Sequence, residues 1–217
     1  MSNPVDLVLH HYWRSSSSWR VRWGLALKGI PYRSHAVDLL KGEQGDTEFV
    51  AKLSPLAVVP CLEVEGRALT ESMAILELLE EMHPTPALLP KVPFRRARVR
   101  QLAELVNAGT QPLQNLTVMR YRSTDPAEQK TWARHWITRG LTAIERELAI
   151  IAAEGIEGPY AVGDTITLAD LLLTPQIYNA RRFDIDLAPF PRIVAAETAA
   201  LETDAAKASH PDSFKPA

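Results

Sequence analysis

The stretch YWRSSSSWRVRWGLALKG, Tyr12–Gly29, is the part of this sequence from which the fold is most directly worked out. A short apolar run of strand length, DLVLHH at 6–11, comes directly before it. Apolar residues then recur at helical spacing, and Gly29 stands where a glycine commonly ends a helix. We therefore predict a strand followed by a helix whose first turn carries the four serines Ser15–Ser18.

The sequence that follows continues with strands and a second helix. IPYRSHAVDL at 30–39 alternates loosely and predicts a strand, and the polar segment 41–47 predicts a loop. VVPCLEVEG followed by RALTES predicts a hairpin that turns near Glu65 and Gly66. The segment 71–84 predicts a helix that proline stops. The predicted order is β-α-β-loop-β-β-α.

The character of the chain then changes, and nothing beyond Val92 resembles a strand. Apolar residues recur at helical spacing throughout this part. Asp125 before Pro126 is typical of a helix cap followed by proline at the first helical position. Thr167 and Asp170 have the spacing of a capping box. The fold class is therefore α/β followed by all-α.

This change divides the chain into two predicted domains. Residues 1–84 form the α/β domain, 85–92 a linker and 93–217 an all-helical domain. The tail at 209–217 is polar and contains proline, so we expect it to be loose.

Composition excludes several classes of function. The 217 residues are 46% hydrophobic and 23% charged, with a formal net charge of -2, so nothing points to nucleic acid. No apolar run is long enough to span a membrane, and the polar N-terminus does not resemble a signal peptide. The single cysteine, Cys61, allows no internal disulfide and is expected to pack as a small core residue. We expect a cytoplasmic protein.

Eight segments, in order and spacing, resemble the zeta class of glutathione transferases, which includes maleylacetoacetate isomerases. They are RSSSSWRVR, LALKGIPY, VVPCLEVEG, LTESMAILELLEE, HPTPALLP, GTQPLQNLTV, GDTITLADLLLTPQIYNARRFDIDL and HPD. The resemblance implies a thioredoxin-like domain that binds glutathione and a helical substrate domain, the glutathione transferase fold. One departure is Ser17, which stands where the family has a cysteine.

The resemblance gives the serines a chemical role. A helix N-terminus stabilises an anion, and a serine hydroxyl there can donate to a thiolate. The resemblance implies that Ser15 activates the glutathione thiol and that Ser16 and Ser17 line the same site. Alternatively, these serines are only helix caps and polar loop residues.

Further glutathione contacts are implied around the hairpin and the second helix. Val59, before a proline expected in the cis form, is implied to pair its backbone with the cysteinyl part, as an added strand would. Ser72 is implied to hold the γ-glutamyl carboxylate, with Glu71 near its ammonium, and Gln44 is a weaker candidate for the glycyl end. The alternatives are an ordinary edge-strand proline and an ordinary capped helix.

Gln111 and Asn115 are implied contributions from the helical domain to glutathione binding. They are four residues apart, which would place them on one helical face. Their alternative role is a polar surface between subunits.

Arginines are the candidates for holding a substrate with two carboxylates, because the guanidinium forms a planar fork. Arg14 and Arg182 match the family in this role. Arg181 is expected to be solvated, and Arg20 and Arg22 are expected to form structural ion pairs.

The function implied is glutathione-dependent cis–trans isomerisation of maleylacetoacetate to fumarylacetoacetate, in tyrosine and phenylalanine catabolism, by reversible thiolate addition. Glutathione is then the cofactor, a small dicarboxylate the substrate and a homodimer the expected assembly; no metal is needed. Alternatives are a maleylpyruvate isomerase, a transferase that conjugates or dehalogenates small α-halo acids, and a non-catalytic protein of the same fold.

Overall fold

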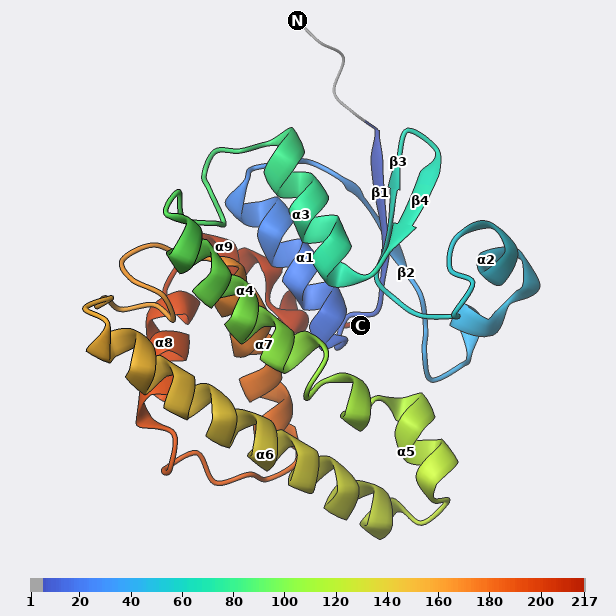
Figure 1. Ribbon diagram of the computed structural model, residues 1–217. Coiled ribbons are helices and arrows are strands. Elements are labelled where there is room, and N and C mark those ends of the chain that lie inside the picture. The colour runs from blue at the N-terminus through green and yellow to red at the C-terminus, as the bar shows by residue number, and fades with distance from the viewer. Residues whose placement is uncertain (1–5, 217) are drawn as a thin grey trace, which may run out of the picture. The chain divides into compact units, whose positions relative to one another are not determined.

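The computed structural model describes residues 6–216, and this part of the chain divides into two compact units (Figure 1). One unit takes the chain up to Pro86 together with the segment from Asp204 onward, and the other is Ala87–Thr203. The predicted domains, 1–84 and 93–217, differ from these units at the C-terminal end, where the last segment belongs with the first unit.

A four-stranded sheet in the order β2-β1-β3-β4 organises the first unit. β1 pairs parallel with β2 and antiparallel with β3, and β3 and β4 form an antiparallel hairpin through Glu65 and Gly66, which both have positive φ. The predicted order of strands and helices along the chain is confirmed, apart from a short helix in the predicted loop. The strands are β1 Leu7–His11, β2 Arg33–Ala36, β3 Cys61–Val64 and β4 Arg67–Thr70.

Two helices, α1 Ser16–Leu27 and α3 Ser72–Met82, lie beside each other against one face of this sheet (Figure 1). Alternate residues of β1 and β3 point to this face and bury apolar side chains against both helices. The resulting core consists of Leu7, Leu9, Val21, Leu25, Ile30, Leu62, Val64, Ile75 and Leu79.

A short helix, α2 Thr47–Lys52, follows a 3₁₀ turn at Glu43–Gly45. The loop predicted at 41–47 was therefore wrong in part. Phe49 of α2 is buried and meets the ring of His10 edge-on at 6.1 Å. A six-residue helix is too short to be stable alone, so α2 depends on tertiary packing such as the burial of Phe49.

The second unit is built from helices around α7, in which twelve of fifteen residues are buried. Among residues 6–216, no helix combines the length and the apolar character that a membrane span requires. The helices of this unit are α4 Pro93–Asn107, α5 Leu116–Arg122, α6 Pro126–Ala153, α7 Leu168–Arg182 and α8 Pro191–Leu201, with a 3₁₀ turn at Pro112–Gln114.

The helix caps predicted in this unit are present. Asp125 caps α6 by accepting from the Ala127 N–H at 2.9 Å. In the capping box of α7, the Asp170 carboxylate accepts from the Thr167 N–H at 2.9 Å and from its hydroxyl at 3.0 Å. The other oxygen of Asp170 accepts from the Ala161 N–H at 2.8 Å, so this cap also ties the preceding loop to the helix.

The C-terminal segment packs against α1, so the expectation of a loose tail at 209–217 was wrong for residues 209–214; residue 217 lies outside the described residues. It forms α9 Asp204–Ser209 and a 3₁₀ turn at Pro211–Phe214. Trp19 Nε1 donates to Ser209 Oγ at 3.2 Å, and the Phe214 ring stacks on the Arg22 guanidinium at 4.5 Å. These contacts join residues about 190 positions apart, so the local polarity of the tail did not reveal them.

Gly140 marks a close crossing within the second unit. A Cβ at this position would lie 2.7 Å from Thr110 Cγ2 and 2.9 Å from Thr110 Cβ. Because Thr110 is fully buried, Gly140→Ala should lower the free energy of unfolding by about 1–3 kcal/mol, as overpacking does.

Urea unfolding measures this effect. Combining Gly140→Ala with Thr110→Ala should cost less than the sum of the two single variants. A Gly140→Ala protein as stable as the parent would contradict the crossing.

Candidate functional site

Ser15 is the N-cap of α1, and its Oγ accepts from the Ser18 N–H at 3.2 Å. A serine hydroxyl has two acceptor sites and one proton. Capping therefore uses an oxygen lone pair and leaves the proton to be donated. The capping role and the predicted catalytic role are compatible in one half-buried side chain.

The other serines of the run have different environments. Ser18 is fully buried, and its Oγ accepts from the Tyr12 N–H at 3.4 Å, which is a structural role. Ser16 is buried and Ser17 half-buried in the first turn of α1. Only Ser15 is both a cap and accessible, while the predicted roles of Ser16 and Ser17 stay predictions.

Arg22 fixes the loop that leads into this cap. Its guanidinium is buried and donates to Trp13 O at 3.0 Å, to Tyr12 O at 3.4 Å and to Ser209 O at 3.2 Å. It also bonds His11 Nδ1 at 3.1 Å. The ion pair predicted for Arg22 was wrong, because carbonyl oxygens and an imidazole take the place of a carboxylate.

This arrangement keeps His11 neutral. Burial, followed by the positive charge of Arg22, lowers the pKa of His11 from 6.5 to about 3. A neutral imidazole can offer a lone pair to the guanidinium, which a protonated one cannot. The His11 Nε2 atom lies 2.7 Å from Ser34 Oγ, which ties β1 to β2.

Two places among the described residues of the first unit offer unpaired backbone groups, one at Val59 and one at the start of α3. The Val59–Pro60 bond is cis, as predicted, and Val59 is half-buried with no backbone hydrogen bond to any of residues 6–216. Glu71 is exposed at the N-cap with φ 68°, and its side chain makes no capping hydrogen bond. Ser72 follows at 3% exposure, and its Oγ accepts from Arg20 Nη1 at 3.1 Å.

These groups fit the parts of glutathione predicted to bind them. Unused backbone groups at Val59 suit an added strand, and the uncapped first turn of α3 suits a carboxylate. Gln44 lies in the 3₁₀ turn after β2, half-buried, where its Oε1 has no hydrogen-bond partner among the described residues. Arg14 is half-buried with its guanidinium 5.3 Å from the centre of the Trp13 ring.

The helical contribution differs from the prediction. Gln111 and Asn115 do not share a helical face, because Pro112–Gln114 forms a 3₁₀ turn between them and Asn115 is extended, with φ −67° and ψ 146°. Gln114 takes the buried position and donates to Gln176 Oε1 at 2.6 Å.

The two arginines at the end of α7 have separate roles. Arg182 is exposed and donates to Asn179 Oδ1 at 3.1 Å, which restrains its direction. Arg181 is exposed, as expected, and it also forms a bidentate pair with Glu197, a carboxylate only 3% exposed, including a 2.5 Å bond from Nη2. Arg181 therefore joins α7 to α8.

Cys61 packs in the core as predicted. It is fully buried, and its thiol donates to Leu53 O at 3.4 Å. Burial raises the pKa of this thiol to about 11. A thiol that stays protonated is a poor nucleophile, so Cys61 does not replace the family cysteine that Ser17 displaces.

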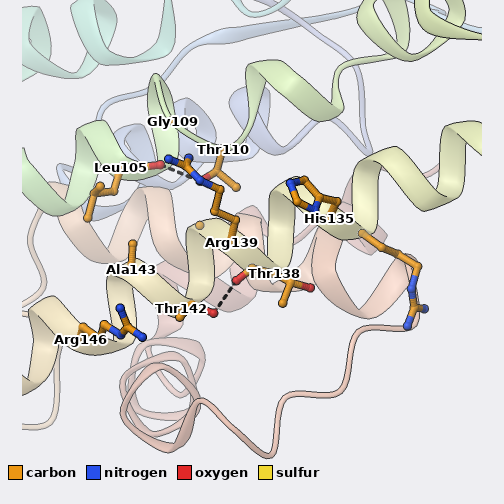
Figure 2. Close-up of a pocket in the computed structure, with 11 residues that line it drawn as sticks. Leu105, Gly109, Thr110, His135, Thr138, Arg139, Thr142, Ala143 and Arg146 are labelled. Carbon is orange, nitrogen blue, oxygen red and sulfur yellow. Dashed lines mark hydrogen bonds between the residues drawn. The ribbon is translucent and has the colours of Figure 1, made fainter.

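Two cavities, one in each unit, lie away from the predicted site residues. A cavity of about 670 Å³ opens between the end of α4 and α6, where Arg139 extends from α6 toward Gly109 and Thr110 (Figure 2). A cavity of about 760 Å³ beside α2 is lined by His10, Phe49 and Glu63, among others. No predicted site residue lines either cavity.

Sequence reasoning assigned no site role to Arg20, although the structure joins it to Ser72. The helical spacing of α1 puts Arg20 among buried residues such as Trp19 and Trp23, and a buried arginine was the available signal.

Comparison with known proteins agrees with this geometry. Residues 14–82 match the family model for the N-terminal domain of glutathione S-transferase. A maleylpyruvate isomerase structure, described as a bacterial zeta-class glutathione S-transferase, aligns with a TM-score of 0.90 and 42% identity over 96% of this chain and 98% of that chain. The sheet and the helical unit thus define a glutathione S-transferase fold.

Relatives of known sequence narrow the class. Maleylacetoacetate isomerase of Rattus norvegicus is 45% identical, covering 94% of this chain and 92% of the relative. The crystal structure of maleylacetoacetate isomerase from Anaeromyxobacter dehalogenans 2CP-1, with bound GSH in the active site, is 50% identical with a TM-score of 0.86 and covers 97% of both chains. The chain belongs to the zeta-class glutathione S-transferase and maleylacetoacetate isomerase family.

The pKa of His11 predicts a pH dependence of stability. The unfolded chain protonates His11 below about pH 6.5 while the folded chain does not until about pH 3, so acid favours unfolding within this window. His11 should therefore contribute a loss in the free energy of unfolding of about 1.4 kcal/mol per pH unit below its ordinary pKa.

Urea unfolding at pH 7, 6 and 5 tests this for the parent and His11→Asn, in which the amide oxygen can still accept from Arg22. The variant should show the shallower slope. His135→Asn, which removes an exposed imidazole from α6, is the matched control. Equal slopes in the parent and His11→Asn would show that His11 does not drive the acid sensitivity.

Proposed function

We propose that this chain catalyses the glutathione-dependent cis–trans isomerisation of maleylacetoacetate to fumarylacetoacetate by reversible thiolate addition. The observation that carries the proposal is Ser15 at the N-terminus of α1, where its capping bond leaves the hydroxyl proton free to donate. Family membership supplies the class of reaction in which such a hydroxyl is needed.

The energy required of Ser15 is modest. A free thiol has a pKa of about 8.5, and lowering it by about two units takes roughly 2.7 kcal/mol of preferential stabilisation of the thiolate. One hydrogen bond to a charged group contributes about 1.5–3 kcal/mol. The hydroxyl of Ser15 and the N-terminus of α1 are together sufficient.

We assign each candidate group of the first unit one role in binding glutathione. Val59 pairs its backbone with the cysteinyl part, and Ser72 with the first N–H groups of α3 holds the γ-glutamyl carboxylate. Glu71 lies near the ammonium group, and Gln44 serves the glycyl end. Ser16 completes the lining around the sulfur.

Ser17, Gln111 and Asn115 are assigned secondary roles. Ser17 lines the sulfur site with a hydroxyl that cannot form the mixed disulfide open to a cysteine. Gln111 and Asn115 contact glutathione in the same or a neighbouring subunit. The assembly that we infer is a homodimer, and we infer that it is located in the cytoplasm.

The reaction divides between cofactor and chain. Bound glutathione would supply a thiolate that adds to one carbon of the cis double bond, while the electron pair of that bond moves to the conjugated carbonyl oxygen as an enolate. The remaining single bond could then rotate, and return of the electron pair would expel the thiolate and leave the trans double bond. Ser15 holds the sulfur as an anion before addition and after elimination. Arg14 and Arg182 clamp the two carboxylates, and the bond from Arg182 to Asn179 limits the directions in which its guanidinium can point.

Maleylpyruvate isomerisation is the second candidate, because it needs the same groups acting on a shorter acid. A relative from Ralstonia sp named maleylpyruvate isomerase is 44% identical and covers 95% of this chain and 100% of the relative. A transferase that conjugates or dehalogenates small α-halo acids would use the same thiolate but consume it.

The deciding assay follows loss of maleylacetoacetate, coupled to fumarylacetoacetate hydrolase, with and without glutathione. We expect turnover only with glutathione and no net loss of thiol. Parallel reactions contain maleylpyruvate or a small α-halo acid. Turnover of maleylpyruvate alone would favour the second candidate, and consumption of thiol would favour a transferase.

Ser15→Ala should reduce isomerase turnover by about 10²–10⁴, the range for loss of a group that stabilises charge or handles a proton. It should also cost about 1 kcal/mol of stability through loss of the cap. Asp125→Ala removes a comparable cap from α6 and separates the two effects, because it should leave turnover unchanged. Ser15→Thr, which keeps the hydroxyl, should retain activity. Full turnover in Ser15→Ala would exclude Ser15 as the activator.

A further inference from the structure

Arg20 lies in the middle of α1 and is fully buried, which is unusual for an arginine. Its Nη1 donates to Ser72 Oγ at 3.1 Å, and Ser72 is the first residue of α3. The bond therefore joins the helix that carries Ser15 to the start of the helix proposed to hold the γ-glutamyl carboxylate.

The direction of this bond determines what Ser72 can do. A guanidinium has five donors and no acceptor, so Ser72 Oγ must be the acceptor. With this lone pair occupied by Arg20, the Ser72 proton is left to be donated elsewhere. A serine held in this way presents a donor in a fixed direction to a ligand at the start of α3.

The charge of Arg20 acts in the same direction. The N-terminus of a helix carries a partial positive charge, which anions favour and cations oppose. Arg20 adds a full positive charge beside the start of α3, where no side-chain hydrogen bond from Glu71 caps the helix. Burial limits screening by water, so the positive potential offered to an approaching carboxylate is stronger than either source alone gives.

We propose that Arg20 is a positioning residue for glutathione, which acts through Ser72 on the γ-glutamyl α-carboxylate. This inference rests on the proposed glutathione site. Arg20 fixes the Ser72 hydroxyl as a donor and raises the positive potential at the start of α3. It does not act on the thiol, so its loss weakens binding of glutathione more than it slows the reaction of the bound cofactor.

If the bond between Arg20 and Ser72 only held α1 and α3 together, its loss would weaken the binding of glutathione and of an analogue without the α-carboxylate by the same factor. The test therefore compares the binding of these two ligands. Calorimetry measures the Kd of glutathione and of 4-aminobutanoyl-Cys-Gly, which is glutathione without the γ-glutamyl α-carboxylate. The ratio of the two Kd values reports recognition of that carboxylate alone. A general loosening of the fold leaves the ratio unchanged.

The main variant is Arg20→Met, which fills a similar volume without charge or donor. In the parent we expect the analogue to bind more weakly than glutathione by about 10- to 100-fold, the effect of hydrogen bonds to a charged group. Arg20→Met should bring this ratio close to that of Ser72→Ala, and the double variant should lose little more than either single one. The kcat at saturating glutathione should stay within about threefold of the parent, since the group does not touch the reacting atoms.

Matched controls separate folding from recognition. Arg181→Met removes another arginine from a buried partner, Glu197, and should lower the melting temperature without changing the Kd ratio. Arg20→Lys keeps the charge but not the planar fork and should give an intermediate ratio. If Arg20→Met does not fold, the ratio in Arg20→Lys decides: a reduced ratio supports the proposal, and the parental ratio overturns it.

The outcomes also distinguish the two proposals. The role of Arg20 is overturned if the parent and Arg20→Met both bind glutathione and discriminate equally well against the analogue. The proposed function then still stands. A parent that does not bind glutathione overturns both.

Discussion

The buried guanidinium of Arg22 is the interaction on which the geometry of the first unit depends. A charge removed from water must have its donors satisfied, and Arg22 does this with carbonyl oxygens of Tyr12, Trp13 and Ser209 and with the imidazole of His11. These partners come from the end of β1, from the loop after it and from the C-terminal segment. One side chain thus fixes three segments at the start of α1.

The candidate site depends on this constraint because it is built on the ends of helices. Ser15 caps α1 directly after the loop that Arg22 holds. Arg20, in the same helix, donates to Ser72 at the start of α3. A helix end offers backbone donors without side-chain flexibility, so fixing the two helices also fixes the donors. The same side chains that stabilise the fold therefore orient the site.

Much of the fold could be predicted locally. The succession of strands and helices in the first unit, the turn at Glu65, the cap at Asp125 and the box formed by Thr167 and Asp170 each depend on residues close together in the chain. The burial of Cys61 followed from its position in a strand. The candidate residues of the first unit followed from a resemblance in motif, since a serine run or a Glu-Ser pair alone is also typical of ordinary caps.

The sequence by itself determined the two fold classes and the helix caps, because these depend on short spacing and residue type. The family and the candidate site residues came from the resemblance of its motifs to a known family. Only the tertiary structure decided the helix α2, the ordered C-terminal segment, the separation of Gln111 from Asn115 and the partners of Arg20 and Arg22. The physical reason is the same for α2, the C-terminal segment and the buried arginines. A marginal helix, a polar tail and a buried charge are stable only through contacts with residues distant in the chain, and local propensity contains no information about those contacts.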